Sequence, residues 1–225
     1  MEDGSNITIK DSIIGKNDAR HGGVIFSQDN SWILIHGTTL RSNRANRFGG
    51  VIHALHNSSV LVNDSTFDSN NAGNNGGVFD CFYVTSIRMY GSKFMHNFAR
   101  LKGGVLVITN ANSKDSQVST TNEVKDCTFS NNSAPYGGVF ALQRKVNMTI
   151  QRSNFNSNTT KTDGGILHAL IWCSITIYNS SFNDTMAVNN GVLLASYNCN
   201  ITIYGSQFNN NTRGGSRKIK RGVHK

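Results

Sequence analysis

The sequence predicts an all-β fold, a right-handed parallel β-helix of about eight stacked turns, from three repeating features. A glycine pair recurs with a period of 26–27 residues. Apolar residues then alternate with polar ones at the two-residue period of a β-strand. A large apolar residue and an asparagine follow at fixed distances. Repetition at this period is typical of solenoids, in which each turn needs only a thin row of buried side chains.

The glycine pairs mark one corner of each turn. Paired glycines suit a corner where the backbone needs a positive φ and where side chains would clash with neighbouring turns. The longer interval of 34 residues after Gly103 indicates an insertion at residues 109–121. This polar stretch predicts a projecting loop, which either belongs to a binding face or is a tolerated surface loop. The pairs begin at Gly22, Gly49, Gly76, Gly103, Gly137 and Gly164, and Asn190-Gly191 takes the next place.

Two strands are predicted in each turn. The first follows the glycines directly and turns a large apolar residue inward. The second contains two apolar residues, ten and twelve positions after the second glycine, with a polar residue between them in most turns. Such alternation buries one face of a strand and leaves the other in water. The inward pairs of the second strand are Ile7/Ile9, Ile33/Ile35, Val60/Val62, Ile87/Met89, Met148/Ile150, Ile175/Ile177 and Ile201/Ile203.

A third inward position lies 17 residues after the second glycine, and an asparagine stands three residues beyond it. Asparagine tolerates the left-handed region, and its amide can bond the asparagine stacked on it, so we expect an asparagine ladder. The main alternative fold, a leucine-rich repeat, needs an outer helix or arc, and no 3.6-residue period is present there. The inward residues are Leu40, Phe67, Phe94, Phe129, Phe155, Phe182 and Phe208. The asparagines are Asn43, Asn70, Asn97, Asn132, Asn158 and Asn211, with Thr185 replacing one of them.

The positive charge is concentrated at one end of the chain. Of a net charge of +9, six basic residues lie in residues 213–225, which predicts a disordered basic tail after a repeat domain of residues 1–212. The remaining 16 basic residues nearly balance 13 acidic ones, so we expect no nucleic-acid partner for the repeat domain. No apolar run is long enough to span a membrane, and the first residues do not resemble a signal peptide. We therefore expect either that further segments of a longer extracellular or cell-surface protein flank this chain, or that its export is not encoded in this sequence.

Two motifs alternate in a way that resembles a known repeat. Gly-Gly-Val-Ile at 49–52 precedes Phe-Asp-Ser-Asn at 67–70, and Gly-Gly-Val-Phe at 76–79 precedes Phe-Met-His-Asn at 94–97. They resemble the Gly-Gly-Ala-Ile-like and Phe-x-x-Asn motifs of chlamydial polymorphic outer membrane proteins, over nearly all of residues 7–212. The resemblance implies a β-helix of the pectin-lyase-like superfamily, exposed on a surface and used in adhesion. Valine or isoleucine stands where that family prefers alanine.

These features favour a non-enzymatic, extracellular or cell-surface β-helix that presents polar sheet faces to a glycan or protein ligand, without a cofactor. One alternative is a polysaccharide lyase or glycoside hydrolase, complete or degenerate, and another is a structural spacer in a larger surface protein. The catalytic candidates would be His53 and Asp80, which share an outward position on adjacent turns, with His168 at that position further along. One carboxylate is not the pair that glycoside hydrolysis uses, so we interpret His53 and Asp80 as a surface pair. No acidic cluster predicts a metal site.

Tyr178 and Tyr204 share another outward position on adjacent turns. Stacked tyrosines can bind the apolar face of a sugar ring, or they can simply stabilise the stack.

Cys173 and Cys199 lie 26 residues apart at equivalent positions, so their Cα atoms should be separated by about the 4.8 Å strand spacing. We expect a disulfide between them in a secreted protein, with a stacked pair of free thiols as the alternative. Cys81 and Cys127 occupy different inward rows and are expected to be core residues.

The chain contains ten sequons for N-glycosylation, against about five or six expected by chance from its composition. The excess leads to the hypothesis of a eukaryotic secretory origin. The sequon asparagines are Asn6, Asn57, Asn63, Asn131, Asn147, Asn158, Asn179, Asn183, Asn200 and Asn210.

Overall fold

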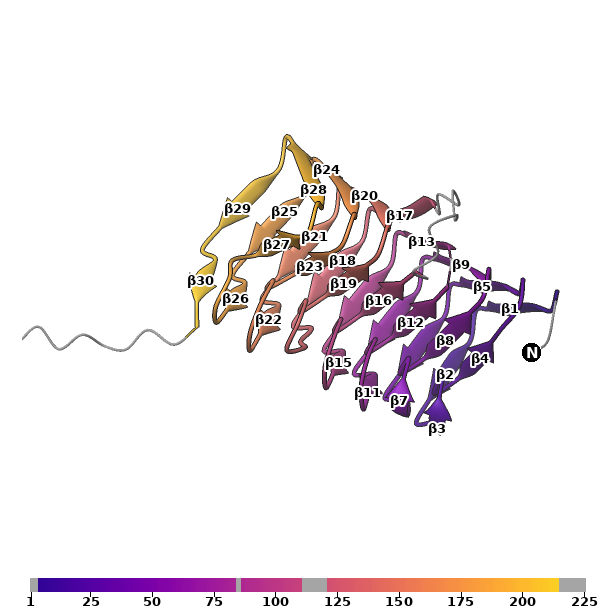
Figure 1. Cartoon of the computed structure of the whole chain (residues 1–225). Helices are drawn as coiled ribbons and strands as arrows, with labels where there is room; N and C mark the ends of the chain where they lie inside the picture. The colour runs from indigo at the N-terminus through magenta and orange to yellow at the C-terminus, as the bar shows by residue number, and fades with distance from the viewer. Residues whose placement is uncertain (1–3, 84–85, 111–120, 215–225) are drawn as a thin grey trace, which may run out of the picture.

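The computed structural model describes residues 4–83, 86–110 and 121–214, and it has the parallel β-solenoid architecture that the repeats predict (Figure 1). Across these residues the regular elements are strands throughout, without a helix. Each strand pairs in parallel with its equivalent in the next turn, and the turns advance along one axis from the N-terminal to the C-terminal end (Figure 1).

Each complete turn passes through four parallel sheets, here named A to D in chain order. Sheet A contains β1 (Asn6–Lys10), β5 (Trp32–His36), β9 (Ser59–Asn63), β13 (Ser86–Tyr90), β17 (Thr121–Lys125), β20 (Asn147–Gln151), β24 (Ser174–Tyr178) and β28 (Asn200–Tyr204). Sheet B contains β2 (Ile13–Gly15), β6 (Thr39–Arg41), β10 (Thr66–Asp68), β14 (Lys93–Met95), β18 (Thr128–Ser130), β21 (Asn154–Asn156), β25 (Ser181–Asn183) and β29 (Gln207–Asn209).

Sheets C and D complete the turn. Sheet C is in two parts, with β3 (Asp18–His21), β7 (Arg44–Phe48), β11 (Asn71–Ala72) and β15 (Phe98–Ala99) in one, and β22 (Thr159–Thr160), β26 (Met186–Ala187) and β30 (Thr212–Arg213) in the other. Sheet D contains β4 (Ile25–Ser27), β8 (Ile52–Leu55), β12 (Phe79–Phe82), β16 (Leu106–Thr109), β19 (Phe140–Gln143), β23 (Leu167–Leu170) and β27 (Leu193–Ser196).

The two strands predicted per turn correspond to sheets D and A. Sheets B and C were not predicted as strands, because most of their strands have only two or three residues. A segment that short cannot display an alternating pattern, and its pairing depends on the turns stacked on either side.

The predicted interior column of aromatic residues is confirmed from Phe67 to Phe182, whereas Phe208 in the last turn continues the stack but is 40% exposed. Successive rings from Phe67 to Phe208 stack with centroid distances of 4.5–5.0 Å and interplanar angles of 3–10°. The strand spacing of about 4.8 Å sets this separation, because each ring belongs to the central residue of a strand in sheet B. The column and the inward residues of sheets A and D form one continuous core.

The asparagine ladder is also confirmed, with one correction. The backbone N–H and Nδ2 of Asn70 both donate to Oδ1 of Asn97, at 3.0 and 3.1 Å, and Nδ2 of Asn70 also donates to the Leu40 carbonyl. The same pattern repeats along the stack and satisfies buried polar groups at this corner. The left-handed conformation, however, belongs to the residue before the ladder asparagine, such as Ser69 with φ 57°.

The two glycines of a pair are required for different reasons. Gly49 has φ +63°, a conformation that side-chain-bearing residues rarely adopt. Gly50 has no such φ, but a Cβ at this position would overlap the backbone carbonyl of Gly77 in the next turn. The pair therefore combines a turn requirement with a stacking requirement.

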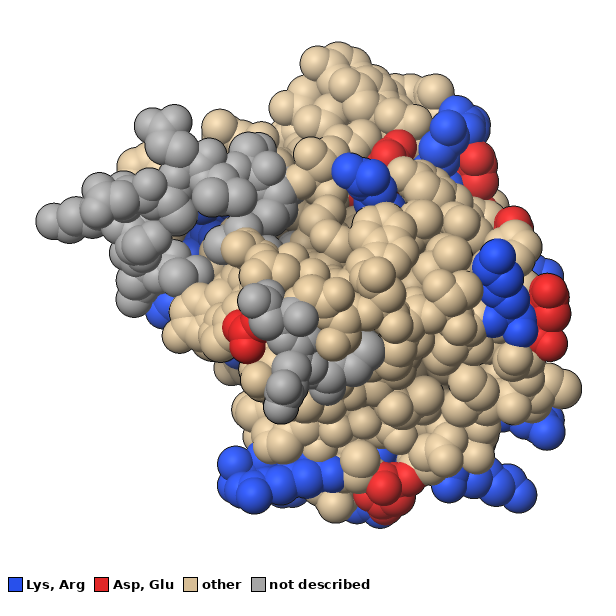
Figure 2. All heavy atoms as spheres, turned by 90° about the vertical axis from the view of Figure 1, so that its right-hand side faces the viewer, with Lys and Arg blue, Asp and Glu red and all other residues tan. Residues whose placement is uncertain are grey.

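The last strand, β30, ends at Arg213, one residue inside the segment predicted as a tail. Residues 215–225, and residues 111–120 of the predicted insertion, lie outside the described residues. Among those that are described, none belongs to a helix long and apolar enough to cross a membrane. Seen from the N-terminal end, most acidic and basic side chains lie towards the edge of the visible face, where the two signs are interspersed (Figure 2).

Candidate functional site

One outward-facing column of the solenoid is unusual, because most of its side chains are buried. It belongs to sheet D, where the residue three positions after the second glycine points away from the core. The column is Phe26, His53, Asp80, Val107, Ala141, His168 and Leu194, in register from turn to turn. Its five central members are buried. The sequence pattern predicts that these positions face outward but does not indicate that they are buried.

A second column lies beside it and helps to explain this burial. Its members stand immediately before the glycine pairs, where sheet C gives way to sheet D, and they too are in register. They are His21, Phe48, Asn75, Lys102, Tyr136 and Asp163. We call these two columns the D face, and we include in it the last residues of the sheet D strands, such as Leu55, Phe82 and Thr109.

His53 and Asp80 lie next to each other on the D face, as their spacing predicts. Nδ1 of His53 is 2.9 Å from Oδ2 of Asp80. Their interpretation as a surface pair is wrong, because the two residues are only 7% and 5% exposed. The rings of Phe48 and Phe26 stack on the His53 imidazole at centroid distances of 5.4 and 5.6 Å. The pair is therefore enclosed by aromatic neighbours from sheets C and D.

Burial governs the electrostatics of this pair. Burial raises the pKa of the Asp80 carboxyl, and the contact with His53 acts in the opposite direction. Burial also lowers the pKa of His21, whose ring lies 5.4 Å from that of His53. The 2.9 Å contact between His53 and Asp80 thus partly offsets the effect of burial on the Asp80 pKa.

A pocket of about 270 Å³ opens beside the His53–Asp80 pair. Its walls are mostly apolar and aromatic. One polar lining atom, Oδ1 of Asn75, is buried and has no hydrogen-bond partner among the described residues. Leaving a buried acceptor unpaired costs about 1–3 kcal/mol, so a ligand hydroxyl that reached this atom would recover part of that cost. The lining residues are Phe48, His53, Leu55, Asn75, Asp80, Phe82 and Thr109.

His168 forms a second, smaller imidazole site on the D face. Tyr136 stacks on its ring at 5.5 Å, burial lowers its pKa, and its Nδ1 has no hydrogen-bond partner in the described part of the chain. Three strand spacings separate it from Asp80, or about 14 Å. The structure therefore does not bring His168 into contact with the His53–Asp80 pair.

The tyrosines predicted to stack on sheet A do stack. The rings of Tyr178 and Tyr204 lie 5.1 Å apart at 11°. An open depression beside them is lined by Gln151, Arg152, Tyr178 and Asn179. Binding of a sugar to this pair stays a prediction.

The four cysteines are present as free thiols, and the expected Cys173–Cys199 disulfide stays a prediction. These two residues are adjacent, and the Cys173 N–H donates to Sγ of Cys199 at 3.2 Å. The Cys173 thiol donates to the Leu170 carbonyl, and burial raises its pKa to about 12. Cys81 and Cys127 are buried, as expected.

The structure also shows a hydroxyl ladder that sequence reasoning missed. The Cys127 N–H donates to Oγ of Ser153, and the Ser153 N–H donates to Oγ of Ser180, each at 3.2 Å. Cys127 thus occupies a serine position in the ladder. Aligning the turns on their glycines would have shown this column, which contains Thr38, Ser65, Ser92, Cys127, Ser153, Ser180 and Ser206.

The sequon asparagines differ in exposure. Asn158 is 0% exposed, and its Oδ1 accepts hydrogen bonds from Asn132 in the ladder, so its expected glycosylation is incompatible with this fold. Asn63 and Asn183 are half-buried. The exposed ones are Asn6, Asn57, Asn131, Asn147, Asn179, Asn200 and Asn210.

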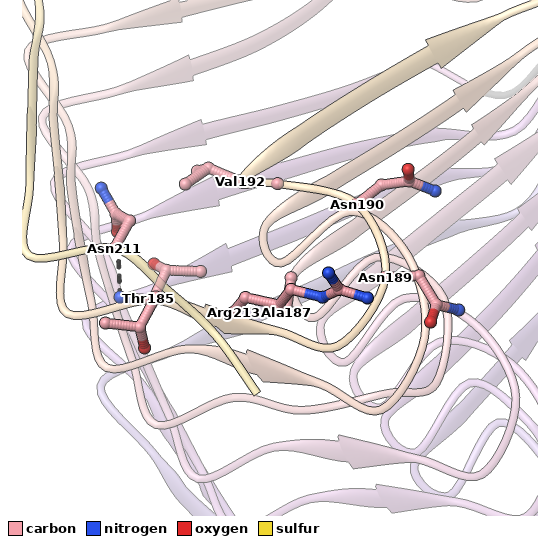
Figure 3. Close-up of a pocket in the computed structure, with 9 residues that line it drawn as sticks. Thr185, Ala187, Asn189, Asn190, Val192, Asn211 and Arg213 are labelled. Atoms are coloured by element: carbon pink, nitrogen blue, oxygen red, sulfur yellow. Dashed lines mark hydrogen bonds between the residues drawn. The ribbon is translucent and has the colours of Figure 1, made fainter. Parts of the chain in front are cut away.

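A second pocket, of about 370 Å³, lies at the C-terminal end of the stack (Figure 3). It forms where the repeat departs from its consensus, with Thr185 in the asparagine position and Asn190-Gly191 in place of two glycines. The Thr185 N–H still donates to Oδ1 of Asn211. Among the described lining residues Arg213 is the charged one, and none is a histidine, an aspartate or a glutamate. This pocket therefore lacks, among its described residues, the histidine and carboxylate that the pocket on the D face contains.

Within the described residues, no three or more histidine, cysteine, aspartate or glutamate side chains cluster as a metal site would require. Comparisons with protein-family models, with curated protein sequences and with solved structures gave no significant match. The resemblance to the chlamydial repeats therefore rests on the quoted motifs.

Proposed function

We propose that this chain is a non-enzymatic β-helix of the cell surface or extracellular space that binds a carbohydrate through the D face. The pocket beside His53 and Asp80 is the anchoring subsite. The observation that carries the proposal is this pocket of about 270 Å³, with aromatic walls and an unpaired buried oxygen, on a sheet face that points away from the core. An adhesive role agrees with the one implied by the resemblance to the chlamydial repeats.

The lining of the pocket suits a sugar ring. A pyranose has an apolar face that packs against aromatic rings, and Phe48 and Phe82 provide such walls. Its hydroxyl groups can donate to Oδ1 of Asn75 and to the Asp80 carboxylate. Among its described residues the lining has no lysine or arginine, which a phosphate-bearing ligand would favour. A small, mostly apolar pocket with a few converging polar groups is the usual form of such a subsite.

Binding of purified protein to a panel of neutral and acidic glycans, with affinities from calorimetry, tests the proposal. Asn75→Ala should weaken binding about tenfold, since it removes one hydrogen bond worth roughly 1–1.5 kcal/mol. The same variant should unfold at an unchanged or higher temperature, because the unpaired buried oxygen is gone. Loss of binding without loss of stability is not expected of a residue with a merely structural role.

Phe82→Ala should weaken binding to a similar extent through loss of the ring wall. Tyr178→Ala on sheet A is the matched control and should bind normally. The opposite pattern, in which only Tyr178→Ala weakens binding, would move the site to the tyrosine stack. If no glycan of the panel binds the unmodified chain, the proposed ligand class is wrong.

The 2.9 Å contact between His53 and Asp80 favours a second candidate, general acid–base catalysis on a polysaccharide. Asp80 is the one carboxylate among the described residues that line the pocket, whereas glycoside hydrolases use two. Incubation with the same panel should produce no new reducing or unsaturated ends. If such ends appear with the unmodified chain and disappear with Asp80→Asn, the enzymatic alternative is correct.

A further inference from the structure

The sequons are distributed unevenly around the solenoid. Within the part of the chain that the structure describes, none of the ten sequon asparagines lies in a strand of sheet C or sheet D. In sheet A they are Asn6, Asn63, Asn147 and Asn200, and in sheet B there is Asn183. The other five lie at corners. Asn179 is between sheets A and B, Asn57 is between sheets D and A, and Asn131, Asn158 and Asn210 are between sheets B and C.

The difference does not arise from a lack of asparagine on the other side. Asn71 lies in sheet C, and Asn75 lies on the D face. Each has a glycine two residues later, where a sequon needs serine or threonine. Of the pockets on this side of the stack, the one beside Phe98 and the one beside His53 contain no acceptor asparagine among their described lining residues. The depression beside Tyr178 on sheet A does contain one, Asn179.

We propose that N-glycans cover the outer face of sheet A and the corners of the solenoid, and leave the outer faces of the strands of sheets C and D, here called the bare half, without glycans. In this modification Nδ2 of asparagine bonds to the anomeric carbon of an oligosaccharide carried on a lipid diphosphate. The bond from that carbon to the diphosphate oxygen breaks, and the lipid diphosphate leaves with one amide proton. The seven exposed asparagines are the acceptors, and Asn158 is excluded by its burial in the ladder.

This glycan pattern assigns different roles to the tyrosine stack on sheet A and to the pocket beside His53 on the D face. A glycan on Asn179 would stand directly beside Tyr178 and obstruct the tyrosine stack. The pocket beside His53 would stay open, and the acceptor nearest in sequence to its lining is Asn57, at the corner two residues after Leu55. The statement about the open pocket rests on the proposed carbohydrate-binding function, whereas the distribution of the glycans does not.

Site-by-site mapping tests the distribution directly. The full chain is secreted from a eukaryotic cell line, and enzymatic deglycosylation in ¹⁸O-labelled water marks each occupied asparagine for mass spectrometry. We expect label at the exposed acceptors and none at Asn158. An unlabelled chain, or label at Asn158 in folded protein, would overturn the proposal.

Relocated glycans test the open pocket. The double variant Leu55→Asn with Asn57→Ser moves the corner sequon onto the pocket wall, and Gln151→Asn creates a sequon at the end of β20 on sheet A. Glycosylated L55N/N57S should bind carbohydrate at least tenfold more weakly than the same variant made in bacteria without glycans. Glycosylated Q151N and N57S alone should bind like the unmodified chain.

The outcomes separate the two proposals. If Q151N weakens binding as much as L55N/N57S, the bare half is not the binding half, although the glycan map can still hold. If the unmodified chain binds no carbohydrate, the proposed function fails, and the map alone decides the inference about glycan placement.

Discussion

The outer faces of sheets A and D differ although both belong to the same repeat. On sheet A the outward column through the middle of the strands is mostly polar, and each member is half-buried or exposed. On sheet D the equivalent column is largely apolar or imidazole-bearing, and its five central members are buried. The sheet A column is Thr8, Leu34, Leu61, Arg88, Glu123, Thr149, Thr176 and Thr202.

This difference shows where the repeat constrains the sequence and where it does not. Inward positions must stack on their equivalents at one strand spacing, so they repeat from turn to turn. Outward positions are free of that requirement and are expected to be polar. A buried outward column, such as the one that contains His53 and Asp80, is therefore a departure that stacking does not require. We interpret it as the mark of a site.

The largest effect on the free energy of unfolding is expected in the core, which lies beneath the outer faces of both sheets. Phe129→Ala removes a fully buried ring that stacks between Phe94 and Phe155. We expect the free energy of unfolding to fall by about 3–5 kcal/mol. Thr149→Ala on the outer face of sheet A should change it by less than about 0.5 kcal/mol. Urea unfolding followed by circular dichroism measures both, and similar losses would mean that the column is not the core.

A smaller effect should distinguish the two outer faces. Val107→Ala on the D face removes two carbon groups from a buried side chain, which corresponds to about 1.5 kcal/mol of unfolding free energy. Thr176→Ala, at the corresponding outward place on sheet A, should be nearly neutral. If Val107→Ala is also neutral, the D face is as open to water as sheet A, and the contrast between the faces disappears.

The architecture could be predicted because it depends on residues that repeat. The glycine pairs, the phenylalanine column and the asparagine ladder each contact their own equivalents, so spacing alone places them. The short strands of sheets B and C could not be predicted, since their hydrogen bonds come from stacking and not from local pattern. The sequence pattern likewise predicts the left-handed conformation at the ladder asparagine, whereas the residue before it, such as Ser69, adopts this conformation. The turn geometry, which sequence spacing does not report, decides which residue adopts it.

The candidate site could be predicted only in part. Register alone placed His53 beside Asp80, because both occupy one outward position on adjacent turns. Their burial depends on Phe48, which comes from sheet C and approaches them across the corner. The unpaired oxygen of Asn75 and the pocket itself likewise arise where two sheets meet. Such contacts join different positions of the repeat, and an alignment of equivalent positions does not show them.

The two faces should also respond oppositely to pH. Burial raises the pKa of Asp80 in the folded chain above its unfolded value of 3.8. The folded state therefore binds the proton more tightly, and this group makes stability fall as pH rises from about 4 towards the folded pKa. Asp80→Asn should be more stable than the unmodified chain at neutral pH, and the difference should vanish below about pH 4. The contact with His53 opposes the burial and limits the size of the effect.

Asp126, at the corner after β17 of sheet A, is the control with the opposite sign. Both carboxylate oxygens bond Arg152 at 2.8 Å, and this pairing lowers the pKa of Asp126. Its contribution to stability is present above about pH 4 and is lost as pH falls through the folded pKa. Thermal unfolding of Asp80→Asn and Asp126→Asn between pH 3 and 7 measures both slopes. Equal slopes would show that the two carboxyl groups have the same environment.

The smallest expected effect concerns the tyrosine stack on sheet A. Tyr178 and Tyr204 lie parallel but partly in water, so their coupling should be near the lower end for aromatic pairs, about 0.5 kcal/mol. A double-mutant cycle with Tyr178→Ala and Tyr204→Ala isolates this coupling from the loss of each ring. A coupling near 0.5 kcal/mol, together with normal carbohydrate binding by Tyr178→Ala, assigns the stack to stability and leaves recognition to the D face. Normal stability with weakened binding would reverse the roles of the two faces.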